Sequence, residues 1–166
     1  MRVLLVGMMG AGKTTVGRLL ADRLDSPYLD SDEQVQQASG LTVPEIFAEQ
    51  GEAAFRMAER EALMRAVASD DEDVVSVAGG AVLDPDNRRL LREAGTIVWL
   101  RAPVSTLAER VGAGAGRPLL GDAPASALAE LYEERRPLYE ELADIVVDVE
   151  DLSPEEVVEE ILRQLP

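Results

Sequence analysis

A glycine-rich string near the start of the chain, GMMGAGKT at 7–14, combines residue types that bind phosphate. This spacing is typical of a loop whose backbone N–H groups converge with a helix N-terminus on phosphate oxygens: a Gly, four further residues, then Gly, Lys and Thr. In such a loop Lys13 contacts the β- and γ-phosphates of a nucleotide, and the Thr14 hydroxyl is a ligand for Mg²⁺. Lys13 is also the only lysine among the 16 basic residues. The string therefore predicts a P-loop, in preference to a glycine-rich turn of purely structural use.

Two carboxylates follow in the string LDSD, where Asp30 and Asp32 lie two residues apart across a predicted strand-to-helix junction. Large GTPases and motor ATPases carry an acid for the magnesium shell at the end of a later strand, but here that strand ends in SVAGG. We therefore expect Asp30 and Asp32 to supply the acid. The alternative is helix capping by Asp30, Ser31 or Asp32, with Ser31 and Gln34 at the spacing of a capping box.

The composition excludes several other kinds of site. The chain has no His and no Cys, which rules out imidazole bases, thiolate nucleophiles, disulfides and His- or Cys-ligated metals. Its net charge of −16 opposes binding to nucleic acids and to anionic membranes. No stretch approaches the roughly 18 uninterrupted apolar residues of a membrane-spanning helix. We expect a soluble, cytoplasmic protein that binds neither nucleic acid nor membrane.

The elements that must position these residues follow from the hydrophobic pattern, which alternates between short apolar runs and segments of helical period. The apolar runs predict buried parallel strands at 2–6, 27–30, 73–78, 96–100 and 144–149. Helical spacing predicts helices after Ser153 and, with an interruption near Gly51, at 14–24, 31–40, 43–68, 85–94, 103–111 and 125–142. This alternation predicts an α/β fold, a three-layer sandwich around a five-stranded parallel sheet. A chain of 166 residues has the size of a single domain, spanning 1–166.

Seven landmarks in order along nearly the whole chain give it a resemblance to the shikimate kinases, which are small P-loop kinases of the nucleoside-monophosphate-kinase type. The landmarks are GMMGAGKTT, LDSD, IFAEQGEAAFR with Glu59 after it, SVAGGAV, GRPLL, ERRPLY and Pro154. The resemblance implies a P-loop NTPase fold with a substrate-binding segment at about 31–60 and a mobile lid at about 112–123. It also implies ATP and Mg²⁺, and transfer of the γ-phosphoryl group to the 3-hydroxyl of shikimate, a carboxylated cyclohexene triol of the aromatic amino-acid (chorismate) pathway. We expect a monomer.

The resemblance also implies roles on the acceptor side. Asp30 resembles the family's acid near magnesium, acting through a bound water, and Asp32 resembles the carboxylate that binds substrate hydroxyls and orients or deprotonates the nucleophile. Arg56 and Arg135 resemble the pair that holds the substrate carboxylate, a task that suits planar guanidinium groups. Gly79 resembles the glycine whose backbone N–H contacts the substrate, and Gly80 follows it in the sequence. The family usually has three consecutive glycines here, whereas the first of these positions is Ala78 in this chain. We expect a modest effect on activity.

On the nucleotide side the resemblance assigns ATP binding to the P-loop and to three residues far from it in sequence. Arg117 in GRPLL resembles a lid arginine that stabilises charge on the transferring phosphoryl group. Arg110 resembles an arginine that lies against adenine, and Pro154 marks a loop near that base. The P-loop residues implied in ATP binding are Gly10, Ala11, Gly12, Lys13, Thr14 and Thr15, with Thr14 and Asp30 on the metal.

Ordinary structural roles remain open for the arginines and the aromatic residues. Arg56 has the spacing for helix-face ion pairs with Glu52 and Glu59, and Arg117 could be a solvated loop residue. A pair between Arg136 and Glu140 would turn Arg136 to solvent and Arg135 to the site. The two phenylalanines, Phe47 and Phe55, could wall the substrate ring or pack in a helix.

Two other functions also remain open. One is a different small-metabolite kinase of the same fold, such as a gluconate kinase or a nucleotide kinase. The other is a non-catalytic nucleotide-binding module. A binding-only module has little need of the lid arginine Arg117 and the acceptor acid Asp32, and a nucleotide acceptor needs a base pocket. Arg56 and Arg135 together with Asp32 suit a compact hydroxylated acid better.

Overall fold

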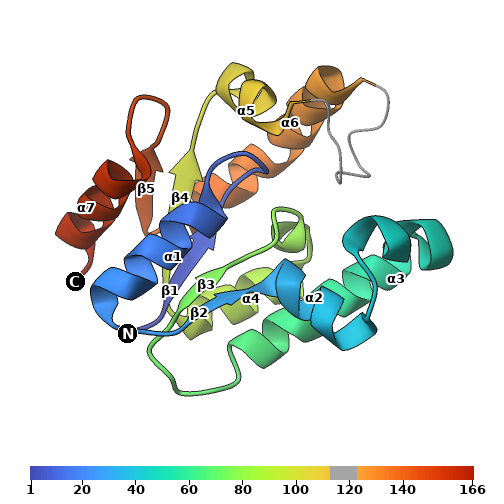
Figure 1. Ribbon diagram of the computed structural model, residues 1–166, viewed down its shortest axis with the longest axis horizontal. Coiled ribbons are helices and arrows are strands. Elements are labelled where there is room, and N and C mark those ends of the chain that lie inside the picture. Colours follow the sequence, from blue (N-terminus) through green and yellow to red (C-terminus); the bar gives the residue numbers. More distant parts are fainter. Residues whose placement is uncertain (113–122) are drawn as a thin grey trace.

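One parallel sheet organises the chain (Figure 1), as the computed structural model shows for residues 1–112 and 123–166. In this part of the chain the sheet has five strands in the order β2-β3-β1-β4-β5. They are β1 (Val3–Val6), β2 (Tyr28–Asp30), β3 (Val74–Ser76), β4 (Thr96–Arg101) and β5 (Ile145–Asp148). The central strand β1 pairs with both β3 and β4, so that Val3 lies level with Val74 and Thr96. The five predicted strands and their parallel arrangement are confirmed.

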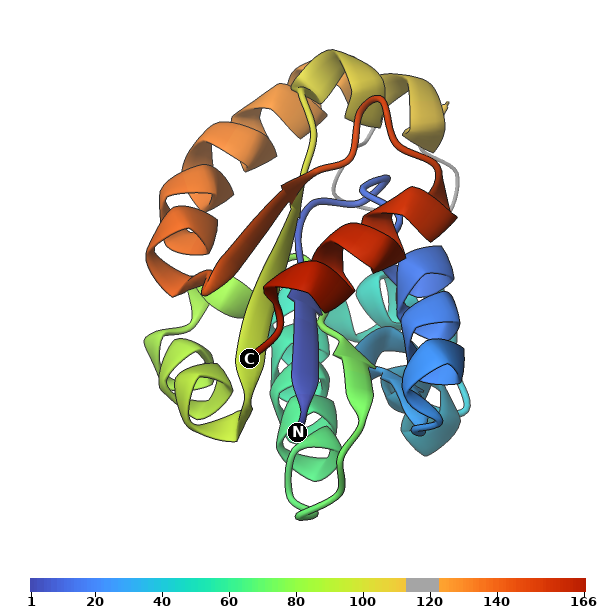
Figure 2. The same ribbon diagram turned by 90° about the vertical axis from the view of Figure 1, so that its left-hand side faces the viewer.

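Helices cover both faces of the sheet. Those described are α1 (Lys13–Leu24), α2 (Ser31–Ser39), α3 (Val43–Ala66), α4 (Pro85–Ala94), α5 (Val104–Val111), α6 (Pro124–Leu142) and α7 (Pro154–Gln164). Helices α1 and α7 contact each other over one face, while α4 and α6 pack against β4 on the other (Figure 2). The molecule is therefore the three-layer α/β sandwich that the alternating pattern predicts.

The strands are hydrophobic because most of them are covered on both faces. All four residues of β1, VLLV, are at most 1% exposed, as expected for a parallel strand between two helical layers. The edge strand β5 alternates instead, with Ile145 and Val147 buried and Val146 and Asp148 exposed. The core thus lies around β1, β3 and β4.

Local sequence signals set the helix boundaries. In α3 the backbone leaves helical geometry at Gly51 (φ 85°, ψ 173°), which confirms the predicted interruption. Helix α7 begins with a capping box in which Ser153 and Glu156 each accept a hydrogen bond from the other's backbone N–H. The short 3₁₀ helix η1 (Ala81–Leu83) was not predicted, because three residues are too few to show a period.

None of the helices in the described ranges is long and apolar enough to cross a membrane.

Candidate active site

A cleft of about 400 Å³ opens where β1, β2 and β3 end at the carboxyl edge of the sheet. The connection from β1 leads outward to β2, whereas that from β3 leads past β1 to β4. Ligands of open α/β sheets bind at such a switch point. The cleft is lined by Met9, Gly10, Gly12, Lys13, Thr14, Thr15, Asp30, Asp32, Val43, Phe47, Phe55, Arg56, Glu59, Ser76, Val77, Ala78, Gly79, Gly80, Arg110 and Arg135.

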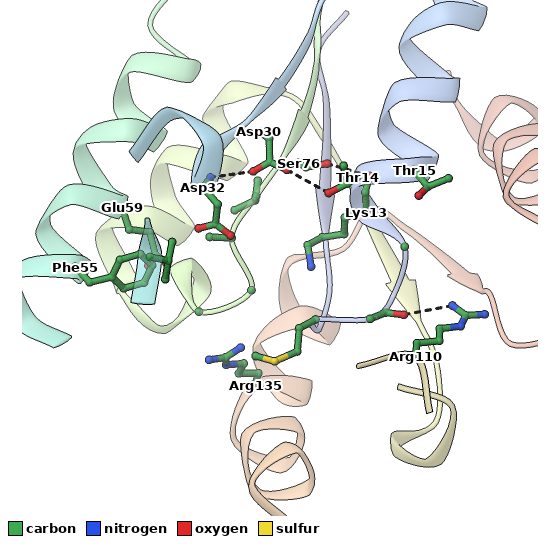
Figure 3. Close-up of a pocket in the computed structure, with 18 of the residues that line it drawn as sticks. Lys13, Thr14, Thr15, Asp30, Asp32, Phe55, Glu59, Ser76, Arg110 and Arg135 are labelled. Carbon is green, nitrogen blue, oxygen red and sulfur yellow. Dashed lines mark hydrogen bonds between the residues drawn. The ribbon is translucent and has the colours of Figure 1, made fainter. Parts of the chain in front are cut away.

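The P-loop joins β1 to α1 and forms one wall of this cleft. Gly12 adopts a left-handed conformation (φ 95°, ψ 17°) and directly precedes the first residue of α1, Lys13. The amino group of Lys13 donates to the carbonyl oxygens of Gly7 at 2.7 Å and Met8 at 3.1 Å, and it points into the cleft in Figure 3. The helix N-terminus and the ammonium group together make this wall suitable for phosphate.

Asp30 uses its two carboxylate oxygens for different contacts. Its Oδ1 accepts from the backbone N–H groups of Asp32 at 2.9 Å and Glu33 at 3.3 Å, which caps α2. Its Oδ2 accepts from the hydroxyl of Thr14 at 3.3 Å and lies 3.2 Å from the hydroxyl of Tyr28. The cap considered as the alternative is therefore present, and the second carboxylate oxygen of the same side chain contacts the P-loop.

Thr14 and Asp30 offer oxygen donors of the kind that Mg²⁺ prefers. The part of the chain that the structure describes holds no group of three or more acidic residues able to bind a metal alone. Mg²⁺ in nucleotide sites is usually bound by one or two carboxylates together with substrate phosphates and water. The residues at this end of the cleft therefore fit a magnesium ion that arrives with a nucleotide.

Ser76 and Tyr28 support the same corner of the site, and sequence reasoning did not find them. The Tyr28 hydroxyl donates to Ser76 Oγ at 2.9 Å, and Ser76 Oγ donates to the Lys13 carbonyl at 3.0 Å. Burial raises the pKa of Tyr28, and the nearby Asp30 charge adds to that increase. The position of Ser76 at the end of a buried strand was the available signal, since strand ends in parallel sheets border ligand sites.

Arg135 on α6 and Arg56 on α3 also line the cleft. Arg135 is only 1% exposed, and its Nε lacks a hydrogen-bond partner among the described residues. Arg56 Nη1 contacts the two carboxylate oxygens of Glu59 at 3.0 and 3.1 Å, and Nη2 lies 3.6 Å from Glu52. The predicted ion pairs of Arg56 are confirmed, and they hold its guanidinium at the cleft.

Arg136 turns the other way, as predicted. It pairs with Glu140 at 3.0 Å on the exposed side of α6. No acidic side chain in the described ranges lies within ion-pair distance of Arg135, although its charge acts on Glu59, whose pKa increase it opposes, and on the Tyr139 hydroxyl. A buried guanidinium group without such a partner is costly unless an anion is bound there, so Arg135 is the stronger indication of an anionic ligand.

Glu59 lies inside the site, although sequence reasoning treated it only as a landmark and an ion-pair partner. Its side chain is 2% exposed. Burial raises its pKa from the usual 4.5 to about 7, against the opposing charge of Arg56. Its position three residues after Arg56 was the signal that could have placed it there.

Small residues in the turn after β3 leave room for two arginines that approach it closely. A Cβ atom at Gly79 would lie 3.1 Å from Arg135 Nη1, and one at Gly80 would lie 2.8 Å from Arg56 Cζ. The backbone N–H groups of Gly79 and Gly80 donate to no described residue. Ala78 fits without clash, and its N–H donates to Ser31 Oγ at 2.8 Å. Ser31 thus ties this turn to α2 instead of forming the capping box considered above.

The two phenylalanines line the cleft and also pack against other apolar side chains. Their rings lie 4.9 Å apart and both line the cleft. Phe55 is also part of a small buried cluster with Val35, Ile46 and Ala62. They form an apolar wall of the cleft that is also packed against α2.

Most of the predicted nucleotide-side residues line the cleft as well. Arg110 donates weakly, at 3.4 Å, to the carbonyls of Gly10 and Val149. Ala11 and Pro154 do not line the cleft: Ala11 is 1% exposed in the core, and Pro154 is the first residue of α7. Arg117 and residues 113–122 of the expected lid lie outside the described residues.

The sheet order, the P-loop and the cleft that combines acidic groups with arginines define a small P-loop kinase. A family model described as shikimate kinase matches residues 9–166, and the chain belongs to the shikimate kinase family. A shikimate kinase of Streptomyces coelicolor is 47% identical over 96% of this chain and 92% of its own length. The structure described as shikimate kinase from Acinetobacter baumannii in complex with shikimate has a TM-score of 0.94 and 36% identity, covering 98% of this chain and 90% of that one. A gluconokinase from Sinorhizobium meliloti has a TM-score of 0.63 and 24% identity, over 98% of this chain and 90% of that one, and shares the fold.

Proposed function

We propose that this chain transfers the γ-phosphoryl group of ATP to the 3-hydroxyl of shikimate. The observation that carries the proposal is the buried guanidinium of Arg135, which lines the cleft and has no acidic side chain of the described residues within ion-pair distance. Shikimate is a small carboxylate with several hydroxyl groups, and a carboxylate is the natural ligand of a buried guanidinium group.

The acceptor is bound by groups on three helices and on the turn after β3. Arg135 on α6 and Arg56 on α3 bind its carboxylate, and the N–H groups of Gly79 and Gly80, which donate to no described residue, meet its oxygens. Asp32, at the start of α2, accepts hydrogen bonds from the hydroxyls. The aromatic wall described above covers one face of the ring.

ATP occupies the P-loop side of the cleft. Its phosphates meet the loop backbone from Gly10 to Thr15, including Ala11 and Gly12, together with the ammonium group of Lys13. Arg110 lies against the adenine ring, and Pro154 belongs to the loop beside the base. Arg117 covers the phosphates from the lid at about 112–123, while residues 31–60 form the substrate-binding segment of the single domain.

Transfer requires alignment more than covalent chemistry. Thr14 and Asp30 hold Mg²⁺, which when bound neutralises charge on the β- and γ-phosphate oxygens. The 3-hydroxyl oxygen forms a bond to the γ-phosphorus while the bond from that phosphorus to the β,γ-bridging oxygen breaks. The hydroxyl proton passes to the Asp32 carboxylate, and ADP leaves with the bridging oxygen.

The surroundings of the reaction follow from the sequence and the chemistry. We infer that the enzyme acts in the cytoplasm, where ATP is available, and that it acts as a monomer, since every residue assigned above comes from one chain. Its charge of −16 disfavours nucleic acids and anionic lipids as partners.

Two neighbouring arginines on α6 provide a matched test. Arg135→Ala removes a buried contact to the acceptor carboxylate, so the shikimate KM should rise by an amount corresponding to roughly 2 to 4 kcal/mol. Arg136→Ala removes only an exposed pair with Glu140 and should leave both kinetic constants unchanged.

The comparison is made by steady-state kinetics with shikimate varied at saturating ATP and Mg²⁺. A normal shikimate KM in Arg135→Ala would contradict the acceptor site. A raised KM in Arg136→Ala alone would mean that α6 presents a different face to the cleft.

A further inference from the structure

Helix α6 carries a second buried polar side chain, Tyr139, which the reaction as described does not use. Tyr139 is 0% exposed and follows Arg135 by four residues, so both side chains lie on the same face of the helix. Its hydroxyl donates to the carbonyl oxygen of Gly79 at 2.7 Å. The same hydroxyl lies 3.9 Å from the sulfur of Met8 in the P-loop.

Tyr139 therefore lies where the nucleotide loop and the acceptor turn meet. A Cβ atom at Gly79 would be 3.3 Å from the Gly7 carbonyl of the P-loop and 3.6 Å from the Tyr139 hydroxyl. The ring also packs against Trp99 of β4, with ring centroids 5.6 Å apart. The hydroxyl is thus fixed by a rigid core on one side and contacts the acceptor turn on the other.

The peptide that follows Gly79 links this contact to the acceptor. A trans peptide is planar, and its C=O and N–H point in opposite directions. The Gly79 carbonyl points to Tyr139, so the N–H of Gly80 points away from Tyr139. That N–H donates to no described residue, and Gly80 lines the cleft.

The hydroxyl keeps its proton at any pH near neutrality. Burial raises the pKa of Tyr139 to about 12, although the charge of Arg135 opposes the increase. Tyr139 is therefore a permanent hydrogen-bond donor to the turn.

We propose that Tyr139 is a positioning residue for the acceptor, whose hydroxyl holds the Gly79–Gly80 peptide so that the Gly80 N–H faces the bound carboxylated acceptor. This inference rests on the proposed function. A phenylalanine would fill the same core space, so the hydroxyl oxygen is the atom that the positioning role requires. Tyr139 touches neither reactant, and Arg135 remains the group that binds the acceptor charge.

The test is Tyr139→Phe, with shikimate binding measured by calorimetry in the absence of nucleotide. Freeing the peptide should weaken shikimate binding about tenfold, as expected for one lost hydrogen bond that orders a ligand contact. The shikimate KM should rise by the same factor, while the ATP KM stays within about twofold of the wild-type value. Tyr132→Phe is the matched control, because Tyr132 is partly exposed on the same helix and does not line the cleft.

Unchanged shikimate binding in Tyr139→Phe, with normal binding by the wild type, would contradict the positioning role alone. Equal weakening of ATP and shikimate would also contradict it, because that result indicates a general loss of structure. Wild-type protein that binds no shikimate would overturn the proposed function and this inference with it. If Tyr139→Phe does not fold, nuclear magnetic resonance of the wild type decides: shikimate should shift the Gly80 amide proton downfield, and an unmoved signal would refute the proposal.

Discussion

At the residue scale, the two carboxylate oxygens of Asp30 have different surroundings. The sequence presented helix capping and metal binding as alternatives, but the two are compatible, because Oδ1 caps α2 while Oδ2 faces Thr14, the other residue proposed to hold Mg²⁺. The resemblance to the shikimate kinases implied that Arg135 and Asp32 belong to the site, and both line the cleft. Periodicity and motif spacing did not place Ser76 or Tyr139, because contacts between buried polar groups distant in sequence depend on how the elements pack.

Substitution of Asp30 should separate its two tasks. Asp30→Ala removes the cap and should lower the free energy of unfolding by about 1 kcal/mol. Asp30→Asn keeps a good capping residue and should lose far less stability, yet it removes the charge beside Thr14. Both variants should bind Mn²⁺, added as a probe with ADP, more weakly than the wild type in paramagnetic resonance titrations. Wild-type Mn²⁺ affinity in Asp30→Asn would contradict the metal role, whatever happens to stability.

Glu59 should make stability depend on pH. The pKa of its carboxyl is about 7 in the folded protein, against a usual value of 4.5. The folded state therefore binds a proton that the unfolded chain releases at lower pH. The contribution of Glu59 to stability is therefore fully present below the pKa of the unfolded chain and is lost as pH rises through the pKa of the folded protein.

Glu59→Gln, which cannot ionise, tests this sign. Its thermal midpoint should match the wild type at about pH 5 and exceed it at about pH 8, because only the wild type then carries a buried carboxylate. The thermal midpoints of both proteins are measured by differential scanning fluorimetry across this pH range. A constant difference between the two proteins at every pH would show that Glu59 does not titrate in the predicted window.

At the element scale, helices and strands were predictable where the period was clear. The predicted helix at 85–94 coincides with α4 (Pro85–Ala94), and the interruption of α3 at Gly51 was foreseen from one residue. The order of the strands and the turn η1 were not predicted. Strand order depends on where each crossover packs. The turn η1 rests on three hydrogen bonds between residues three apart, from the N–H groups of Ala81, Leu83 and Asp84 to the carbonyls of Ala78, Gly80 and Ala81.

Gly51 provides a test of how α3 positions its residues. Its backbone (φ 85°, ψ 173°) lies in a region that is essentially restricted to glycine. A Cβ there would meet nothing within 4 Å, so the cost of Gly51→Ala is backbone strain, and it should lower unfolding stability by about 1 to 3 kcal/mol.

Gly40→Ala is the control for that variant. Gly40 ends α2 in an ordinary left-handed conformation (φ 71°, ψ 7°), and a Cβ added there would likewise meet nothing within 4 Å. Gly40→Ala should lower the free energy of unfolding by roughly 1 to 2 kcal/mol. It should leave the shikimate KM unchanged, since Gly40 does not line the cleft. The free energy of unfolding of both variants is measured by urea denaturation. An unchanged midpoint in Gly51→Ala would mean that the break in α3 is not required.

At the scale of the whole molecule, basic side chains gather in the cleft although the net charge of the chain is negative. The chain carries −16 overall, yet both proposed substrates are anions, and a field of that sign repels them. Lys13, Arg56 and Arg135 concentrate positive charge inside one cleft, where short distances and partial burial strengthen each contact. The acidic exterior favours solubility, and the arrangement confines anion binding to the switch point of the sheet.

Acceptor choice tests the central claim most directly. ADP release is measured with the wild-type enzyme, ATP and Mg²⁺ against shikimate, gluconate and a nucleoside monophosphate at equal concentrations. The cleft predicts rapid ADP formation with shikimate alone, because the two arginines and the Gly79–Gly80 turn form a compact site that suits a hydroxylated carboxylate better than a nucleotide base. Equal or faster turnover with gluconate or with the nucleotide would contradict the account.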